Sequence, residues 1–113
     1  MCSSEDAVLI VKAVAEKSAE LLGADFKCAI LYGSYARGDY DCDSDVDIMV
    51  LADIPADSCT AFRRSLTELT SSLGLEYDVL VSVTVRDVVT FEKWLDVLPF
   101  YQNINREGVK FVA

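Results

Sequence analysis

Hydrophobic residues recur at helical spacing near the start of the chain. Ser3 or Ser4 followed by acidic residues is typical of a helix N-terminus, and Gly23 is typical of a helix end. The apolar positions between them return every three or four residues and predict one buried stripe, made of Ala7, Ile10, Val11, Val14, Ser18, Leu21 and Leu22. The next apolar run, Phe26–Tyr32, is short and predicts a strand that ends at Gly33.

The second half of the chain changes between the helical and the strand period. The pattern predicts a helix that is capped by Asp57 or Ser58 and ends at Gly74. It would have one apolar face, formed by Cys59, Phe62, Leu66, Leu69 and Leu73. Residues 75–83 alternate, which predicts a strand with Asp78 on the face opposite Val79 and Val81. The remaining pattern predicts a helix over 86–94, a helix from Pro99 to Gly108 and a strand over 109–112.

Helices and strands therefore alternate along the chain, which predicts an α/β or α+β domain with helices packed on a mixed β-sheet. The 113 residues, 52% of them hydrophobic, are enough for one compact domain over 1–113 and too few for two.

Composition removes several classes of function. A net charge of −9 argues against direct nucleic-acid binding, because a polyphosphate backbone attracts clustered Lys and Arg. The absence of histidine removes Ser-His-Asp and Cys-His catalysis and His-rich zinc sites. The four cysteines have no metal-site spacing and follow no signal peptide, so we expect a reduced, cytoplasmic compartment. No apolar run is long enough to span a bilayer, and we expect no membrane partner.

The candidate chemistry lies in residues 31–51, LYGSYARGDYDCDSDVDIMVL. Asp45 and Asp47 open an apolar run, and the strand period puts both carboxylates on one face, where they suit a hard cation. Gly33 allows a ligand to approach the backbone, and Ser34 offers a hydroxyl and an N–H where a short helix begins. Arg37 would share the helical face of Ser34 and add a positive charge for phosphate. Together these residues predict a metal-nucleotide site.

Three rival interpretations fit this stretch less well. A Walker A loop needs Gly-Lys-Ser/Thr, whereas Gly38 is followed by Asp39. An EF-hand loop beginning at Asp39 would need glycine at Ser44 and glutamate at Val50. A plain solvated acidic turn leaves Gly33-Ser34 and Arg37 unexplained.

Gly33-Ser34, Arg37-Gly38 and Ser44-Asp45-Val46-Asp47 resemble the signature of the DNA polymerase beta-like nucleotidyltransferase superfamily, and the whole chain resembles its minimal nucleotidyltransferase family. The resemblance implies a nucleotidyltransferase palm and a third acid on the next core strand, which points to Asp78. Asp45, Asp47 and Asp78 would hold two Mg²⁺ ions, with Asp78 also taking the proton of the attacking hydroxyl. Gly33, Ser34 and Arg37 would hold the phosphates of an NTP, ATP in the leading interpretation.

The acceptor is open at this point. Larger relatives hold it with a second domain, for which 113 residues leave no room, so we expect a partner protein to complete the site. Minimal nucleotidyltransferases are often antitoxins that adenylylate a tyrosine of a HEPN-type toxin, and the acidic charge suits a basic partner. Two alternatives are transfer to an aminoglycoside-like small molecule with the help of a partner subunit, and a nucleotide-binding regulatory subunit without turnover.

Overall fold

The structure is a computed structural model that describes residues 2–112. The helices are α1 (Ser4–Leu22), α2 (Ser34–Arg37), α3 (Cys59–Ser65), α4 (Thr67–Tyr77), α5 (Val88–Leu95) and α6 (Pro99–Glu107). Single 3-10 turns lie at Gly23–Asp25 (η1) and Ala56–Ser58 (η2). The strands are β1 (Phe26–Tyr32), β2 (Val46–Ala52), β3 (Val81–Asp87) and β4 (Val109–Phe111).

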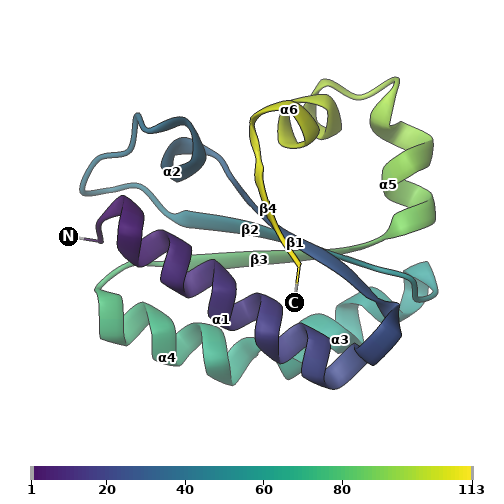
Figure 1. The fold of residues 1–113 in the computed structure, drawn as a ribbon, viewed down its shortest axis with the longest axis horizontal. Helices are drawn as coiled ribbons and strands as arrows, with labels where there is room; N and C mark the ends of the chain where they lie inside the picture. The colour runs from purple at the N-terminus through teal and green to yellow at the C-terminus, as the bar shows by residue number, and fades with distance from the viewer. Residues whose placement is uncertain (1, 113) are drawn as a thin grey trace.

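Within residues 2–112 the strands form one mixed sheet in the order β3-β2-β1-β4 (Figure 1). β1 pairs antiparallel with both β2 and β4, whereas β2 and β3 run parallel. The register places Tyr32 opposite Asp47 on one side and Ser82 beside Asp47 on the other. The predicted α+β fold with a mixed sheet is confirmed.

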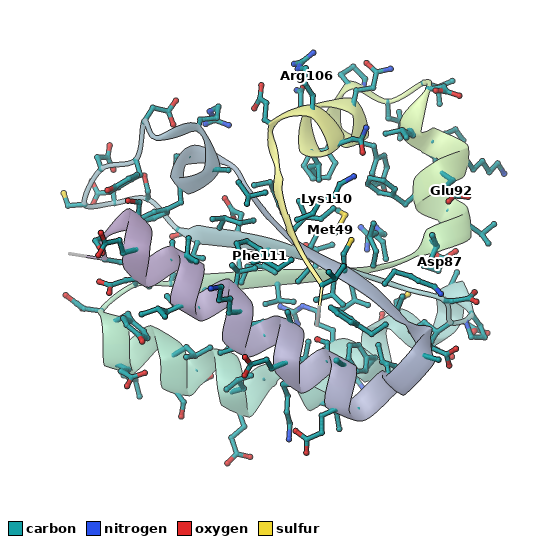
Figure 2. The ribbon with its side chains drawn as sticks, viewed as in Figure 1. Met49, Asp87, Glu92, Arg106, Lys110 and Phe111 are labelled. Atoms are coloured by element: carbon teal, nitrogen blue, oxygen red, sulfur yellow. The ribbon has the colours of Figure 1, made fainter. Side chains whose placement is uncertain are left out.

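Helices cover both faces of the sheet. α1, α3 and α4 cover one face over the larger core, which includes Ile10, Val14 and Ile48. α5 and α6 cover part of the other face over a smaller core of Ile30, Met49, Leu51, Phe91, Tyr101 and Ile104. Figure 2 labels Met49 within this second core and Phe111 at the edge of the first. Because Asp47, Met49 and Leu51 alternate onto one face, Asp47 lies on the α5 and α6 face, at the start of β2.

The first helix forms as its capping signals predict. The Ser3 hydroxyl accepts a hydrogen bond from the Asp6 N–H, and the Asp6 carboxylate accepts one from the Ser3 N–H, which is a capping box. The predicted stripe is buried from Ala7 to Ser18, but Leu21 remains 46% exposed.

The prediction for residues 59–83 is wrong in two places. The single predicted helix is two helices separated at Leu66, and Gly74 lies inside α4 instead of ending it. The predicted strand over 75–83 starts at Val81, because α4 continues to Tyr77 and Asp78 turns the chain with φ 53°. The N–H of Val79 donates to the carbonyl of Gly74 at 3.0 Å, and a Cβ on Gly74 would lie 2.8 Å from the Val79 carbonyl oxygen.

Two tyrosines anchor the loop that carries the candidate site. Tyr35 on α2 is buried and its hydroxyl donates to the Cys2 carbonyl at 2.9 Å. Its ring stacks on Tyr40 with centroids 4.3 Å apart, and the Tyr40 hydroxyl accepts from the Ser4 N–H. Burial raises the pKa of Tyr35 to about 12, so this anchor stays protonated at neutral pH. The start of α1 therefore fixes the acidic loop between α2 and β2.

The turn at Asp78 gives a test of the α4–β3 boundary. In a left-handed turn, Asp78→Val costs about 1–2 kcal/mol, whereas Asp78→Gly is neutral or stabilises by up to about 1 kcal/mol. Urea unfolding of both variants measures their free energies of unfolding and so shows which one is more stable. On a strand the order would reverse, because valine favours strands and glycine does not.

Candidate active site

The centre of the candidate site is the close approach of Gly33 to Asp47. Tyr32 pairs with Asp47 across β1 and β2, so the chain leaves β1 directly beside this carboxylate. Gly33 has φ +77°, and a Cβ placed on it would lie 2.6 Å from Asp47 Oδ2. Only glycine combines that backbone angle with room for the carboxylate. The close neighbour of Gly33 in the structure is thus the Asp47 carboxylate, and the approach of a ligand to this backbone stays a prediction.

Asp45 and Asp47 act on each other electrostatically, as their alternation predicts. Partial burial raises the pKa of Asp47, the negative charge of Asp45 raises it further, and the positive charge of Arg37 opposes both. Two carboxylates that repel each other in a half-buried site gain from a divalent cation between them. The structure thus brings together Gly33, Asp45, Asp47 and Arg37 from strand β2, the short helix α2 and the loop positions that flank them.

The acidic loop uses some of its carboxylates to hold its own shape. The Asp41 carboxylate accepts from the Asp43 N–H at 2.9 Å and from the Ser44 hydroxyl at 3.3 Å, which closes the turn. Asp39 accepts from the Arg37 Nε at 3.2 Å. Within residues 2–112, no ion pair or hydrogen bond engages the carboxylates of Asp43, Asp45 or Asp47, so these three are available to ligands.

Arg37 is held by carboxylates from two directions. Its Nε lies 3.2 Å from Asp39 Oδ2, and its NH1 lies 3.7 Å from Glu107 Oε2 at the end of α6. No sequence signal points to Glu107, because 70 positions separate it from Arg37 and the packing of α6 on β1 brings them together. Tyr32 was missed for a similar reason, since its place beside Asp47 depends on the strand register.

Asp78 does not lie on the strand next to Asp47 as predicted. It follows α4, and it lines a groove of about 620 Å³ that Asp43 and Asp45 also line. The neighbour of Asp47 on β3 is Ser82. Over the described residues 2–112, no three acidic or cysteine side chains gather closely enough to hold a metal ion by themselves.

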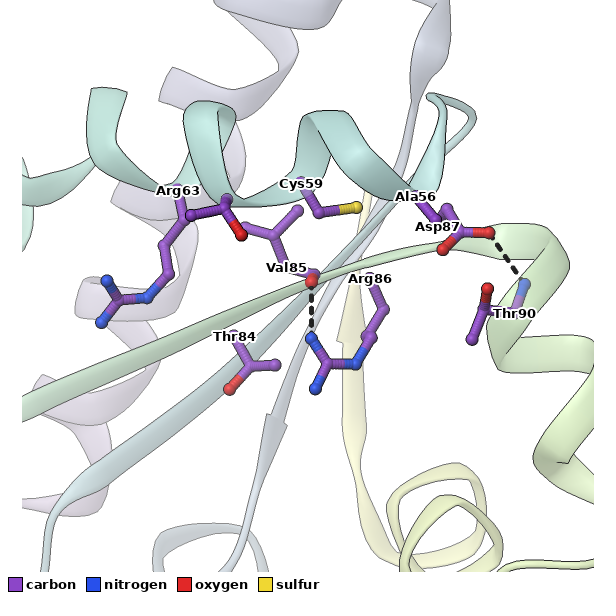
Figure 3. Close-up of a pocket in the computed structure, with 9 residues that line it drawn as sticks. Ala56, Cys59, Arg63, Thr84, Val85, Arg86, Asp87 and Thr90 are labelled. Carbon is purple, nitrogen blue, oxygen red and sulfur yellow. Dashed lines mark hydrogen bonds between the residues drawn. The ribbon is translucent and has the colours of Figure 1, made fainter.

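A separate pocket of about 440 Å³ lies at the far end of β3, beside α3 and α5 (Figure 3). Arg63 and Arg86 line it, and each donates to a carbonyl of β3, from Arg63 Nε to Val83 at 2.7 Å and from Arg86 NH1 to Val85 at 3.0 Å. Both carbonyls point away from β2, on the open edge of the sheet. The two arginines thus protect this edge, and the pocket contains none of the predicted site residues. The Arg63 side chain is thereby bound to β3 and is not simply solvated.

Comparison with known proteins identifies the family. The model of the nucleotidyltransferase domain family matches residues 10–107. Two proteins of Methanocaldococcus jannaschii are similar: "Putative protein adenylyltransferase MJ0604" is 35% identical over 82 residues, covering 73% of this chain and 74% of that protein. "Putative protein adenylyltransferase MJ0141" is 35% identical over 74 residues, covering 65% and 72%. The chain belongs to the nucleotidyltransferase domain family and is a nucleotidyltransferase.

Solved structures share its fold. A crystal structure of a mutant of the toxin-antitoxin MntA-HpeT has a TM-score of 0.52 and 22% identity, covering 88% of this chain and 70% of that chain. A crystal structure of the toxin-antitoxin with AMP-PNP has a TM-score of 0.50 and 20% identity, covering 87% and 70%. Among residues 2–112, none of the helices combines the length and apolar character that crossing a membrane requires.

The raised pKa of Asp47 predicts a pH-dependent effect on stability. Because the folded-state pKa exceeds the unfolded one, ionised Asp47 lowers stability at neutral pH, and this penalty disappears as the pH falls below about 3.9. Asp47→Asn should therefore raise the melting temperature of the metal-free protein at pH 7 and bring no gain at pH 3.5. Asp53→Asn, at the exposed far end of β2, is the control. Equal effects of Asp47→Asn at both pH values would contradict the assignment.

Proposed function

We propose that this chain is a Mg²⁺-dependent adenylyltransferase that moves AMP from ATP to a hydroxyl of a partner protein. The observation that carries the proposal is the site in which Gly33 meets Asp47 while Asp45 and Arg37 act on the same carboxylate. One side of this site presents negative charge for a cation, and the other presents a backbone turn and a guanidinium for phosphate. A metal-bound nucleotide requires both.

The acidic residues fit Mg²⁺. This ion is commonly held by one or two carboxylates together with substrate phosphates and water, so the pair Asp45 and Asp47 suffices without a third protein ligand. Their mutual repulsion and the absence of an ion-pair partner for either within residues 2–112 leave a negative site to be neutralised. When bound, two Mg²⁺ ions would stabilise the charge on the attacking and leaving oxygens. We propose Asp78, which lies on the groove side, as a further ligand of the metal.

Ser34 and Arg37 would hold the phosphates. Ser34 begins α2, where the first N–H groups have no carbonyl partner within the helix, and its hydroxyl is a further donor. The Arg37 side chain is 45% exposed and already faces two carboxylates at the edge of the site. Phosphate oxygens can replace these carboxylates on the guanidinium, which would leave Arg37 opposite the departing pyrophosphate.

The proposed reaction breaks a phosphoanhydride bond of ATP and forms a phosphoester bond to the acceptor hydroxyl. The acceptor oxygen bonds to the α-phosphorus of ATP, the bond from that phosphorus to the bridging oxygen breaks, and pyrophosphate leaves. The acceptor proton passes to a carboxylate. Asp78 is the proposed base because it lines the same groove as Asp45. Asp45 and Asp47 orient the phosphate, and Arg37 counters the charge of the leaving group.

A protein acceptor is supported by the relatives. Two of them carry the name of protein adenylyltransferases, and the similar folds occur in toxin-antitoxin structures, one of them with AMP-PNP. We therefore propose that the chain acts as an antitoxin on a tyrosine of a HEPN-type toxin, in the cytoplasm where ATP is available. Transfer to a small molecule is the competing outcome of the experiment below.

The test is AMP transfer from labelled ATP to the protein product of the adjacent gene, followed by mass spectrometry of the modified residue. Asp45→Asn combined with Asp47→Asn should reduce the rate about a hundredfold or more, because it removes several kcal/mol of transition-state stabilisation. The matched control is Asp53→Asn with Asp57→Asn, two exposed aspartates beyond β2. Near-normal transfer by the first variant would refute the metal assignment, and labelling of a small molecule only would refute the protein acceptor.

A further inference from the structure

The groove beside Asp45 has a composition that the nucleotide does not explain. It lies between the acidic loop and the segment from the last turns of α4 to the start of β3, and holds about 620 Å³. Figure 1 shows the α2–β2 loop and the end of α4 at the same end of the sheet. The volume is within the range of about 300–1,000 Å³ that is common for ligand pockets.

The charge of the groove excludes an anionic ligand. Asp43, Asp45 and Asp78 line it, and its lining residues include neither Lys nor Arg. None of these three carboxylates forms an ion pair with a residue in 2–112. A polyphosphate or an RNA would be repelled here, whereas Arg37 offers the phosphates a cation on the other side of the site. The complement of this groove is a positively charged molecule.

The rim of the groove is apolar and unusually exposed. Leu75 is 87% exposed, the highest value among the exposed large hydrophobic residues, and Leu80 is 66% exposed. Both line the same groove as the three carboxylates. Single exposed leucines need no explanation, but two at the rim of one acidic groove favour a ligand with apolar as well as cationic groups. Polypeptides combine both in a few residues.

We propose that this groove docks a basic, leucine-containing segment of a protein acceptor and thereby delivers its hydroxyl group to Asp45. The assignment rests on the proposed adenylyltransferase function, and it adds where the partner binds and which chemistry is recognised. The nucleotide occupies the side of Gly33 and Arg37, and the acceptor approaches from the opposite side of Asp45. Docking in the groove turns a chance encounter into a positioned attack.

The test uses peptide binding, which requires no nucleotide. A fluorescein-labelled peptide with one tyrosine, two leucines and four lysines is titrated with the protein, next to a peptide in which glutamate replaces each lysine. We expect the lysine peptide to bind, its affinity to fall as salt is raised, and the glutamate peptide not to bind. Amide NMR shifts in the ¹⁵N-labelled protein should concentrate in 42–45 and 74–81.

Matched variants locate the binding. Leu75→Gln with Leu80→Gln, and separately Asp43→Lys, should each weaken binding of the lysine peptide about tenfold or more, roughly 1.4 kcal/mol. Val97→Gln with Leu98→Gln changes two exposed apolar residues between α5 and α6 and should leave affinity unchanged. ATP affinity should be unchanged in the two glutamine variants, since none of their four positions lies on the Gly33 and Arg37 side.

Several outcomes overturn the docking assignment. The assignment is wrong if the lysine peptide does not bind measurably or if both peptides bind equally. It is also wrong if the wild-type protein and the groove variants bind the lysine peptide with equal affinity, or if the Val97 and Leu98 variant loses affinity instead. Failure of the adenylyltransferase function has a different signature, in which the peptide binds in the groove but its tyrosine gains no AMP in the presence of ATP and Mg²⁺.

Discussion

The antiparallel pairing of β1 with β2 is the constraint on which the candidate site depends. It places Tyr32 opposite Asp47, and the chain then has to turn away beside a carboxylate. The turn is feasible because Gly33 has a positive φ and no Cβ to meet Asp47 Oδ2. The same turn starts α2, whose Tyr35 is anchored to the Cys2 carbonyl, so the hydrophobic core on the α1 side supports the polar site on the other.

This arrangement separates opposite charges within a strongly acidic molecule. Arg37 lies on the α2 side with Glu107 and Asp39 around it, and the carboxylates of Asp43 and Asp45, which have no ion-pair partner within residues 2–112, lie on the groove side. The proposed anionic nucleotide and the proposed cationic acceptor segment would therefore occupy separate regions of the surface, which meet at Asp45 and Asp47. The net charge of −9 is thus compatible with binding a phosphate ligand, because the local charges decide where each ligand approaches.

Sequence alone predicted the elements whose ends carry strong local signals. The capping box at Ser3, the glycine after β1 and Pro99 in the first turn of α6 each fix an end through one or two residues. The boundary between α4 and β3 has no such signal, because the alternation from Leu75 onward competes with the helical spacing of Leu66, Leu69 and Leu73. What ends the helix is a local turn, in which Asp78 adopts the left-handed conformation that aspartate tolerates and the Val79 N–H donates to the Gly74 carbonyl.

The contacts of the candidate site also divide into those that local sequence predicts and those that it does not. The proximity of Asp45 and Asp47 was predictable from the strand period because they are two positions apart at the start of β2, whereas the approach of Gly33 to Asp47 depends on the register of β1 and β2. Glu107, Tyr32 and the groove at Leu75 depend on the register and on the packing of distant elements, which the sequence pattern does not contain.

The central claim is that the carboxylates opposite Gly33 hold the metal that brings ATP into the site. Isothermal titration calorimetry of ATP binding, with and without Mg²⁺, tests it in the wild-type protein and in Asp47→Asn. We expect Mg²⁺ to strengthen ATP binding to the wild-type protein and Asp47→Asn to lose this gain while remaining folded. An equal Mg²⁺-dependent gain in both proteins would contradict it.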